Sequence, residues 1–94
     1  MRFFILAFVL LSFPAQAQDI TIGSKSFTEN VILGDIAAGL AQDNGATVTH
    51  RKELGGSRIL WEALLSGEID AYPDYSGTLF QEILESEGVS SLEE

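Results

Sequence analysis

The sequence contains no cysteine, a single histidine, and only 5 lysines and arginines against 14 aspartates and glutamates, for a formal net charge of −9. Without cysteine, a disulfide-stapled scaffold is excluded, and so is a thiol that could carry a lipid anchor. An acidic surface repels both nucleic acid and anionic lipid, so neither is expected as a partner. The composition excludes these classes of partner and does not identify one.

Residue types that catalyse reactions or hold metals are few and scattered. The single histidine, His50, has no partner at metal-ligand spacing and no serine or cysteine arrangement typical of a triad, so we expect it to be exposed to solvent. Asp70 and Asp74 stand four residues apart with no evident base. We therefore predict a protein that is not an enzyme and that uses no metal and no cofactor.

The first residues are typical of a secretory signal peptide. Met1 and Arg2 give a positive start, residues 3–13 are almost wholly apolar, and residues 15–17 have the A-x-A form, which predicts cleavage before Gln18. An uncleaved membrane anchor is the alternative, but the apolar run is shorter than the roughly 20 residues that span a bilayer. We expect a periplasmic monomer with no direct membrane insertion after cleavage.

The remaining residues alternate between strand and helix patterns. Strands are predicted at residues 18–23, 46–54 and 69–72, and helices from Ser26 or Thr28 to residue 43, from residue 57 to 66, and from about residue 77 to 87. Ser26 and Glu29 fit a capping box for the first helix, although Thr28 is an alternative cap. The order β-α-β-α-β-α predicts an α/β fold with a parallel sheet and right-handed crossovers.

Apolar residues at helical spacing predict the faces that pack inward, and Trp61 and Tyr72 are interpreted as packing residues. The expected inward residues are Ile32, Ile36, Leu40, Ile59, Leu60, Ala63, Leu64, Leu79, Phe80, Ile83 and Leu84.

Two candidate binding segments follow the first two strands. Residues 23–28 join the first strand to its helix, where free amides and the helix dipole favour an anion and Lys25 adds a full positive charge. The alternative is that Ser26 and Thr28 only cap the helix and Lys25 is solvated. Residues 55–57 either form a turn and cap or point backbone amides into a cleft. Walker and dinucleotide glycine patterns are both absent, which excludes a phosphate loop.

A third candidate segment follows the last predicted strand, where Tyr75 and Thr78 stand at the carboxyl edge of the sheet. Ligands of open α/β sheets bind in the crevice beyond that edge. A tyrosine ring can stabilise a quaternary ammonium, and a threonine hydroxyl can donate a hydrogen bond. A half-buried core aromatic is the alternative for Tyr75. The pattern indicates that a small solute is bound rather than transformed.

Three motifs carry a resemblance to a known family: residues 22–30 (IGSKSFTEN), 54–57 (LGGS) and 67–78 (GEIDAYPDYSGT). In this order they resemble the substrate-binding proteins of osmoprotectant ABC transporters, which bind glycine betaine, choline or carnitine. The resemblance covers essentially the whole chain after residue 17. It implies a type II periplasmic binding fold, in which two α/β lobes close over the ligand, and two partners: a quaternary ammonium solute and a membrane permease.

The resemblance also implies roles for individual residues. Lys25 and Thr78 match the positions that contact the ligand carboxylate, and Tyr75 matches one wall of the aromatic cage around the trimethylammonium head. Ser24 and Gly56, which stand in the first two motifs, complete the candidate ligand-binding set.

The length departs from this pattern, because a two-lobe receptor needs roughly 200–300 residues at ordinary domain sizes. We therefore expect residues 18–94 to form the N-terminal part of a first lobe, incomplete as given. A sensory or interaction module built on the same lobe, or a non-functional truncated remnant, is the alternative. An enzyme on a related two-lobe fold has no support among the residues present.

Overall fold

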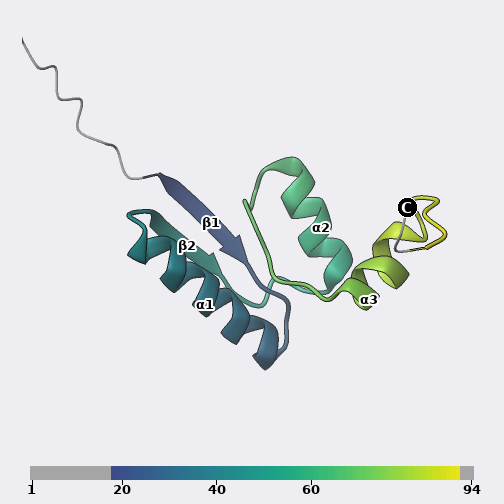
Figure 1. Cartoon of the computed structure of the whole chain (residues 1–94), viewed down its shortest axis with the longest axis horizontal. Coiled ribbons are helices and arrows are strands. Elements are labelled where there is room, and N and C mark those ends of the chain that lie inside the picture. Colours follow the sequence, from purple (N-terminus) through teal and green to yellow (C-terminus); the bar gives the residue numbers. More distant parts are fainter. Residues whose placement is uncertain (1–17, 92–94) are drawn as a thin grey trace, which may run out of the picture.

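The computed structural model describes residues 18–91, so the signal peptide predicted at residues 1–17 lies outside the described residues. The elements, in chain order, are strand β1 (Asp19–Gly23), helix α1 (Thr28–Asp43), strand β2 (Thr47–Arg51), helix α2 (Ser57–Ser66), helix α3 (Ser76–Leu79) and the π-helical segment η1 (Phe80–Leu84). Figure 1 shows the two strands between α1 and α2, with α3 projecting away from them. The predicted α/β class is confirmed.

The sheet is parallel, as predicted, but has two full strands instead of three. Strands β1 and β2 pair from Asp19 opposite Thr47 to Gly23 opposite Arg51. The third predicted strand is reduced to one parallel bridge between Ile22 and Ala71. Pro73 follows closely and has no N–H to continue the ladder, which explains the short pairing.

Helix α1 packs through its small residues, contrary to the prediction. Its buried positions are Asn30, Gly34 and Ala38, which recur every four residues and so share one face of the helix. The larger residues expected inside are exposed instead: Ile32 is 53% exposed, Ile36 55% and Leu40 61%. The capping box also fails, because the N-cap residue is Phe27 and no side chain caps the helix.

The apolar core lies under α2. Leu60, Ala63 and Ile69 are buried together, and Leu54, Leu64 and Tyr72 pack against them. Tyr72 therefore packs as predicted, and Trp61 is half-buried. Ile59 was expected to face inward but is exposed. The helix ends at Gly67, whose φ of 82° is the left-handed conformation that glycine adopts readily.

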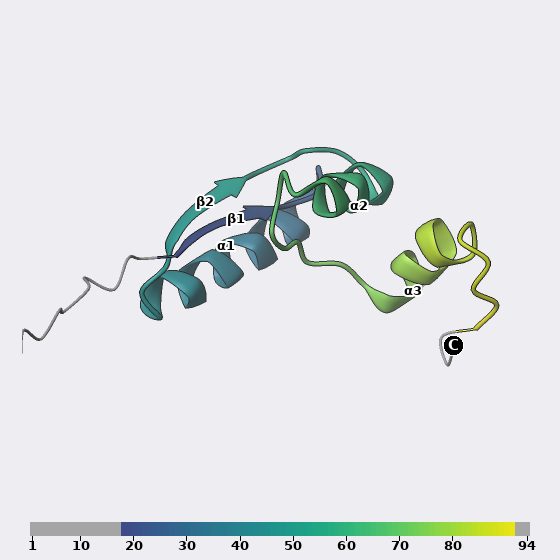
Figure 2. The same cartoon turned by 90° about the horizontal axis from the view of Figure 1, so that it is seen from above.

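The last helical stretch is shorter than predicted and changes its winding. In the two views of Figures 1 and 2, α3 extends beyond the sheet and its two longer helices. Ile83 is fully buried, and Arg58 of α2 donates a hydrogen bond to the backbone carbonyl of Glu82 (3.1 Å). These contacts attach η1 to α2. Within residues 18–91, no helix combines the length and the apolar character needed to cross a membrane.

His50 is enclosed between β2 and α1, so the expectation that it is solvent-exposed is wrong. Its side chain is 8% exposed, with Nδ1 2.8 Å from Asp35 Oδ1 and Nε2 2.9 Å from Ser24 Oγ. The His50 side chain thus bridges Ser24 and Asp35 in a serine–histidine–aspartate hydrogen-bond chain, which the sequence spacing did not indicate. Ser24 is completely buried, so its hydroxyl cannot reach a substrate. The hydrogen-bond chain instead joins the β1–α1 loop, α1 and β2.

Gly34 is the position on which this packing depends, because a Cβ there would lie 2.4 Å from His50 Nε2. We expect Gly34→Ala to lower the free energy of unfolding by about 1–3 kcal/mol, the usual cost of overpacking. Gly39→Ala is the matched control in the same helix, since its Cβ would meet nothing within 4 Å. It should raise stability by up to about 1 kcal/mol through helix propensity. Urea denaturation followed by circular dichroism measures both, and equal effects would contradict the packing.

Candidate functional site

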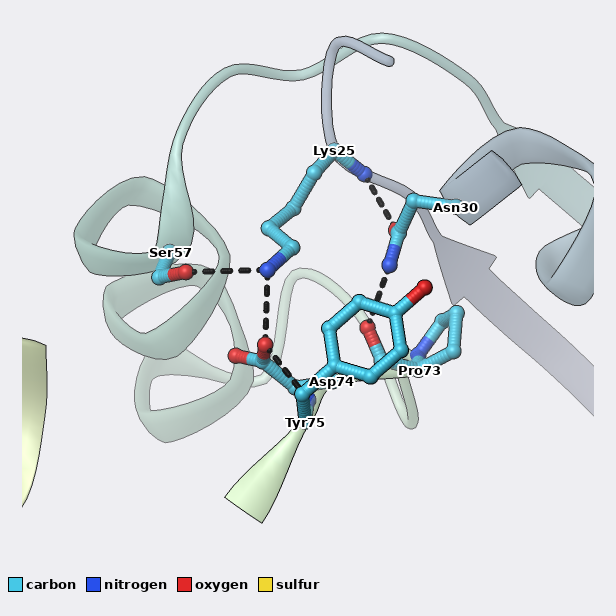
Figure 3. Close-up of polar contacts among 6 residues, drawn as sticks. All are labelled: Lys25, Asn30, Ser57, Pro73, Asp74 and Tyr75. Atoms are coloured by element: carbon cyan, nitrogen blue, oxygen red, sulfur yellow. Dashed lines mark hydrogen bonds and ion pairs between the residues drawn. The ribbon is translucent and has the colours of Figure 1, made fainter. Parts of the chain in front are cut away.

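Lys25 is the centre of the site, at the carboxyl end of β1. Its side chain is only 4% exposed, and its ammonium donates to Asp74 Oδ1 (2.6 Å) and to Ser57 Oγ (3.1 Å) (Figure 3). Sequence spacing indicated no partner for Asp74, and in the structure its partner is the Lys25 ammonium. Ser57 is the first residue of α2, and its hydroxyl binds Lys25 while Gly56 takes the N-cap position.

A buried asparagine holds the backbone around this pair. Asn30 is completely buried in the first turn of α1; its Oδ1 accepts from the Lys25 N–H (2.7 Å) and its Nδ2 donates to the Pro73 carbonyl (2.8 Å) (Figure 3). The Ser26 N–H also donates to the Gly55 carbonyl (3.0 Å). Three loops far apart in the sequence are therefore fixed side by side. Asn30 was not predicted as a site residue, because apolar periodicity assigned its face of α1 to solvent.

Two aromatic rings flank the Lys25 ammonium. The centroid of the Phe27 ring lies 5.2 Å from Nζ and that of the Tyr75 ring 5.6 Å, within the range of a cation–π contact. Phe27 is 42% exposed and Tyr75 37%, so both rings keep surface for a ligand. Phe27 was not predicted as a site residue.

The two tyrosines next to Asp74 are held in their neutral form. Burial raises the pKa of Tyr72 to about 12, and the charge of Asp74 adds to the shift. The Glu29 carboxylate beside the Tyr75 hydroxyl raises the pKa of that group above its ordinary value. A neutral ring keeps its hydroxyl as a hydrogen-bond donor near a group of carboxylates.

A cavity of about 480 Å³ opens beside Lys25, at the carboxyl edge of the sheet. Its lining residues come from the β1–α1 loop, from the β2–α2 loop with the first residue of α2, and from residues 75–82: Lys25, Ser26, Phe27, Gly55, Gly56, Ser57, Tyr75, Thr78 and Glu82. This volume is in the range of small-molecule pockets. The arrangement offers an ammonium, hydroxyls and aromatic surface to one small solute.

The structure brings four of the five candidate ligand-binding residues to this cavity. Lys25, Gly56, Tyr75 and Thr78 all line it. Ser24 does not, because its hydroxyl is buried against His50. The segments after β1 and β2 and before α3 therefore meet at one edge, as their positions in an α/β chain predict.

The family of the chain follows from its similarity to known proteins. A family model for the substrate-binding domain of ABC-type glycine betaine transport systems matches residues 18–91. The chain belongs to this family. The resemblance noted from the three motifs is thus confirmed, and with it the type II periplasmic binding fold, of which residues 18–91 show the parallel α/β portion.

Two curated relatives are similar to this chain over most of its length. One is the glycine betaine-binding protein YehZ of Escherichia coli (strain K12), 35% identical over 68 residues, which is 71% of this chain and 22% of the relative. The other is the chemotactic signal transduction system substrate-binding protein CosB of Halobacterium salinarum, 39% identical over 62 residues, or 65% of this chain and 19% of the relative. The chain therefore spans about a fifth of the length of these relatives. No solved structure matches it significantly.

The buried ion pair gives a stability prediction. Asp74→Asn keeps the shape of the side chain but leaves the Lys25 ammonium without its counter-charge, so we expect the free energy of unfolding to fall by about 3 kcal/mol. Lys52→Gln is the control, because the Lys52–Asp35 pair is about half exposed and 3.4 Å long. Its loss should cost less than about 0.5 kcal/mol. Chemical denaturation compares the two variants, and a loss for Asp74→Asn no larger than the control's would argue against a buried pair.

Proposed function

We propose that the chain forms part of the ligand-binding site of a periplasmic receptor for quaternary ammonium osmoprotectants, glycine betaine or choline, that serves an ABC transporter. The observation that carries this proposal is the pairing, in one cavity, of the Lys25 ammonium with the rings of Phe27 and Tyr75. A betaine has a carboxylate and a trimethylammonium group, and the cavity offers a partner of suitable chemistry to each.

The carboxylate end is proposed to bind Lys25 and Thr78. An ammonium group has three N–H donors, and the described contacts of Lys25 use one for Asp74 and one for Ser57. The third is available to a ligand, and the Thr78 hydroxyl lines the same cavity. Gly56 adds the N-terminal end of α2, where the helix dipole also favours an anion.

The trimethylammonium end is proposed to bind the exposed faces of Tyr75 and Phe27. A quaternary ammonium cannot donate hydrogen bonds and is weakly hydrated, so aromatic faces can replace its water at little cost and attract its charge. The family match and the relative named as a glycine betaine-binding protein support this choice of ligand.

A sensory role is the second candidate function, favoured by the relative that is named as part of a chemotactic signal transduction system. The binding site would be the same in both roles, and the roles would differ in the partner protein that binds the liganded receptor, a permease or a signalling protein. Genes for a permease and an ATPase beside this gene would favour transport, whereas a signalling component beside it would favour sensing.

Tyr75→Ala tests the aromatic contact. We expect the affinity for glycine betaine, measured by isothermal titration calorimetry on the full chain, to fall more than tenfold, since the variant removes one cation–π face worth up to about 2 kcal/mol and its contact area. Tyr75→Phe keeps the ring and should stay within about threefold of the unmodified chain. Unchanged affinity in the alanine variant would remove Tyr75 from the site.

Thr78→Val tests the carboxylate contact, because it replaces the hydroxyl with a methyl group of similar size. Hydrogen bonds to charged groups are worth about 1.5–3 kcal/mol, so glycine betaine should lose roughly tenfold or more in affinity. Choline has no carboxylate and should lose much less. Competition between the two ligands on one sample measures the difference, and equal losses would contradict the carboxylate role.

A further inference from the structure

Glu82 brings an uncompensated negative charge to the cavity. It lines the cavity from η1, and among residues 18–91 no ion pair or hydrogen bond engages its carboxylate. The neighbouring cation, Arg58, contacts only the backbone carbonyl of Glu82 and is otherwise occupied by Ser86 Oγ (2.6 Å) and Glu87 (3.6 Å). The charge of Glu82 is therefore available to a ligand.

Lys25 does not balance this charge. Lys25 and Glu82 are the two ionised side chains in the cavity lining, and Lys25 is already paired with Asp74 at 2.6 Å. Lys25 therefore acts on a ligand mainly as a hydrogen-bond donor, and Lys25, Asp74 and Glu82 together carry one excess negative charge. Such a site attracts a ligand of net positive charge more than a zwitterion.

The position of Glu82 is fixed by its neighbour in the chain. Ile83 is fully buried, and the hydrogen bond from Arg58 holds the Glu82 carbonyl on the side of α2. Residues 80–84 are π-helical, so successive side chains are rotated about the helix axis through a smaller angle than in an α-helix. Such segments frequently occur at functional sites. The carboxylate is thus presented from an anchored backbone.

We propose that Glu82 is a specificity-determining residue that shifts this site toward cationic quaternary ammonium ligands, such as choline, relative to zwitterionic ones such as glycine betaine. This inference rests on the proposed function. Glu82 attracts the ammonium group of either ligand. In glycine betaine the carboxylate lies one methylene away from the ammonium, so its repulsion from Glu82 offsets part of that attraction.

Glu82→Gln, which keeps the size of the side chain and removes its charge, is the test. Calorimetry on the full chain would compare choline, glycine betaine and 3,3-dimethylbutan-1-ol, the uncharged carbon analogue of choline. We expect choline to lose affinity by about three- to fivefold, the range for a partly exposed charge pair, and glycine betaine by less than twofold. The uncharged analogue should not change.

Glu85→Gln is the matched control, because it removes the same charge one turn along the chain from a residue that does not line the cavity. If both variants lowered the affinity for choline equally, the effect would come from the net charge of the protein, and the proposal would be overturned. Equal losses of affinity for choline and glycine betaine in Glu82→Gln would overturn it as well.

A second measurement needs no variant. Raising the ionic strength from 10 to 200 mM should weaken choline binding to the unmodified chain and leave the uncharged analogue unaffected, because salt screens an exposed charge. Salt-independent choline binding would also overturn the proposal. If the unmodified chain binds neither choline nor glycine betaine, the proposed function fails and this inference fails with it. If it binds both and Glu82→Gln leaves their ratio unchanged, only the role of Glu82 fails.

Discussion

The ion pair between Lys25 and Asp74 is the interaction on which the site depends. The two residues are 49 positions apart, and their contact joins the end of β1 to the segment that leads into α3. A buried ion pair is stable only if hydrogen bonds compensate for the loss of water. Here the Ser57 hydroxyl accepts from the Lys25 ammonium, and the Tyr75 N–H donates to Asp74 Oδ1 at 2.8 Å. The compensating groups are themselves lining residues of the cavity or their immediate neighbours, so the ion pair and the cavity form one structure.

The order of the first four elements and the edge at which the site forms could be predicted from the sequence, because both follow from local patterns. Alternation in residues 18–23 and 47–50 predicts strands, and the helix between them requires parallel pairing. Ligand-facing loops then meet at the carboxyl edge. The ion pair could not be predicted in this way, since no periodicity indicates which lysine and which aspartate will meet. Lys25 was open to interpretation as solvated, and Asp74 as unpaired, until the fold placed them 2.6 Å apart.

The packing of α1 shows why apolar periodicity alone predicted the wrong buried face for this helix. Two stripes run along this helix at four-residue spacing, one of isoleucine and leucine and one of Asn30, Gly34 and Ala38. The smaller residues face the sheet because they let the helix backbone approach closely enough for His50 to reach Ser24 and Asp35. The histidine was misjudged for the same reason: it packs against Gly34, on a helix face that apolar periodicity assigns to solvent.

The groups that line the cavity fall into two chemical kinds, hydrogen-bond donors that suit an anion and groups that suit a cation. Asp74 cancels the charge of Lys25 but leaves it an N–H donor, and the first turn of α2 adds a partial positive charge, so these groups suit a carboxylate without the attraction of a full unpaired cation. Glu82 and the ring faces suit an ammonium group. On the proposal that Glu82 attracts the ammonium group of a ligand, affinity for the cationic part of that ligand depends on a residue other than those that bind its carboxylate. A change at Glu82 can therefore alter the preference between ligands without disturbing the buried pair that holds the site together.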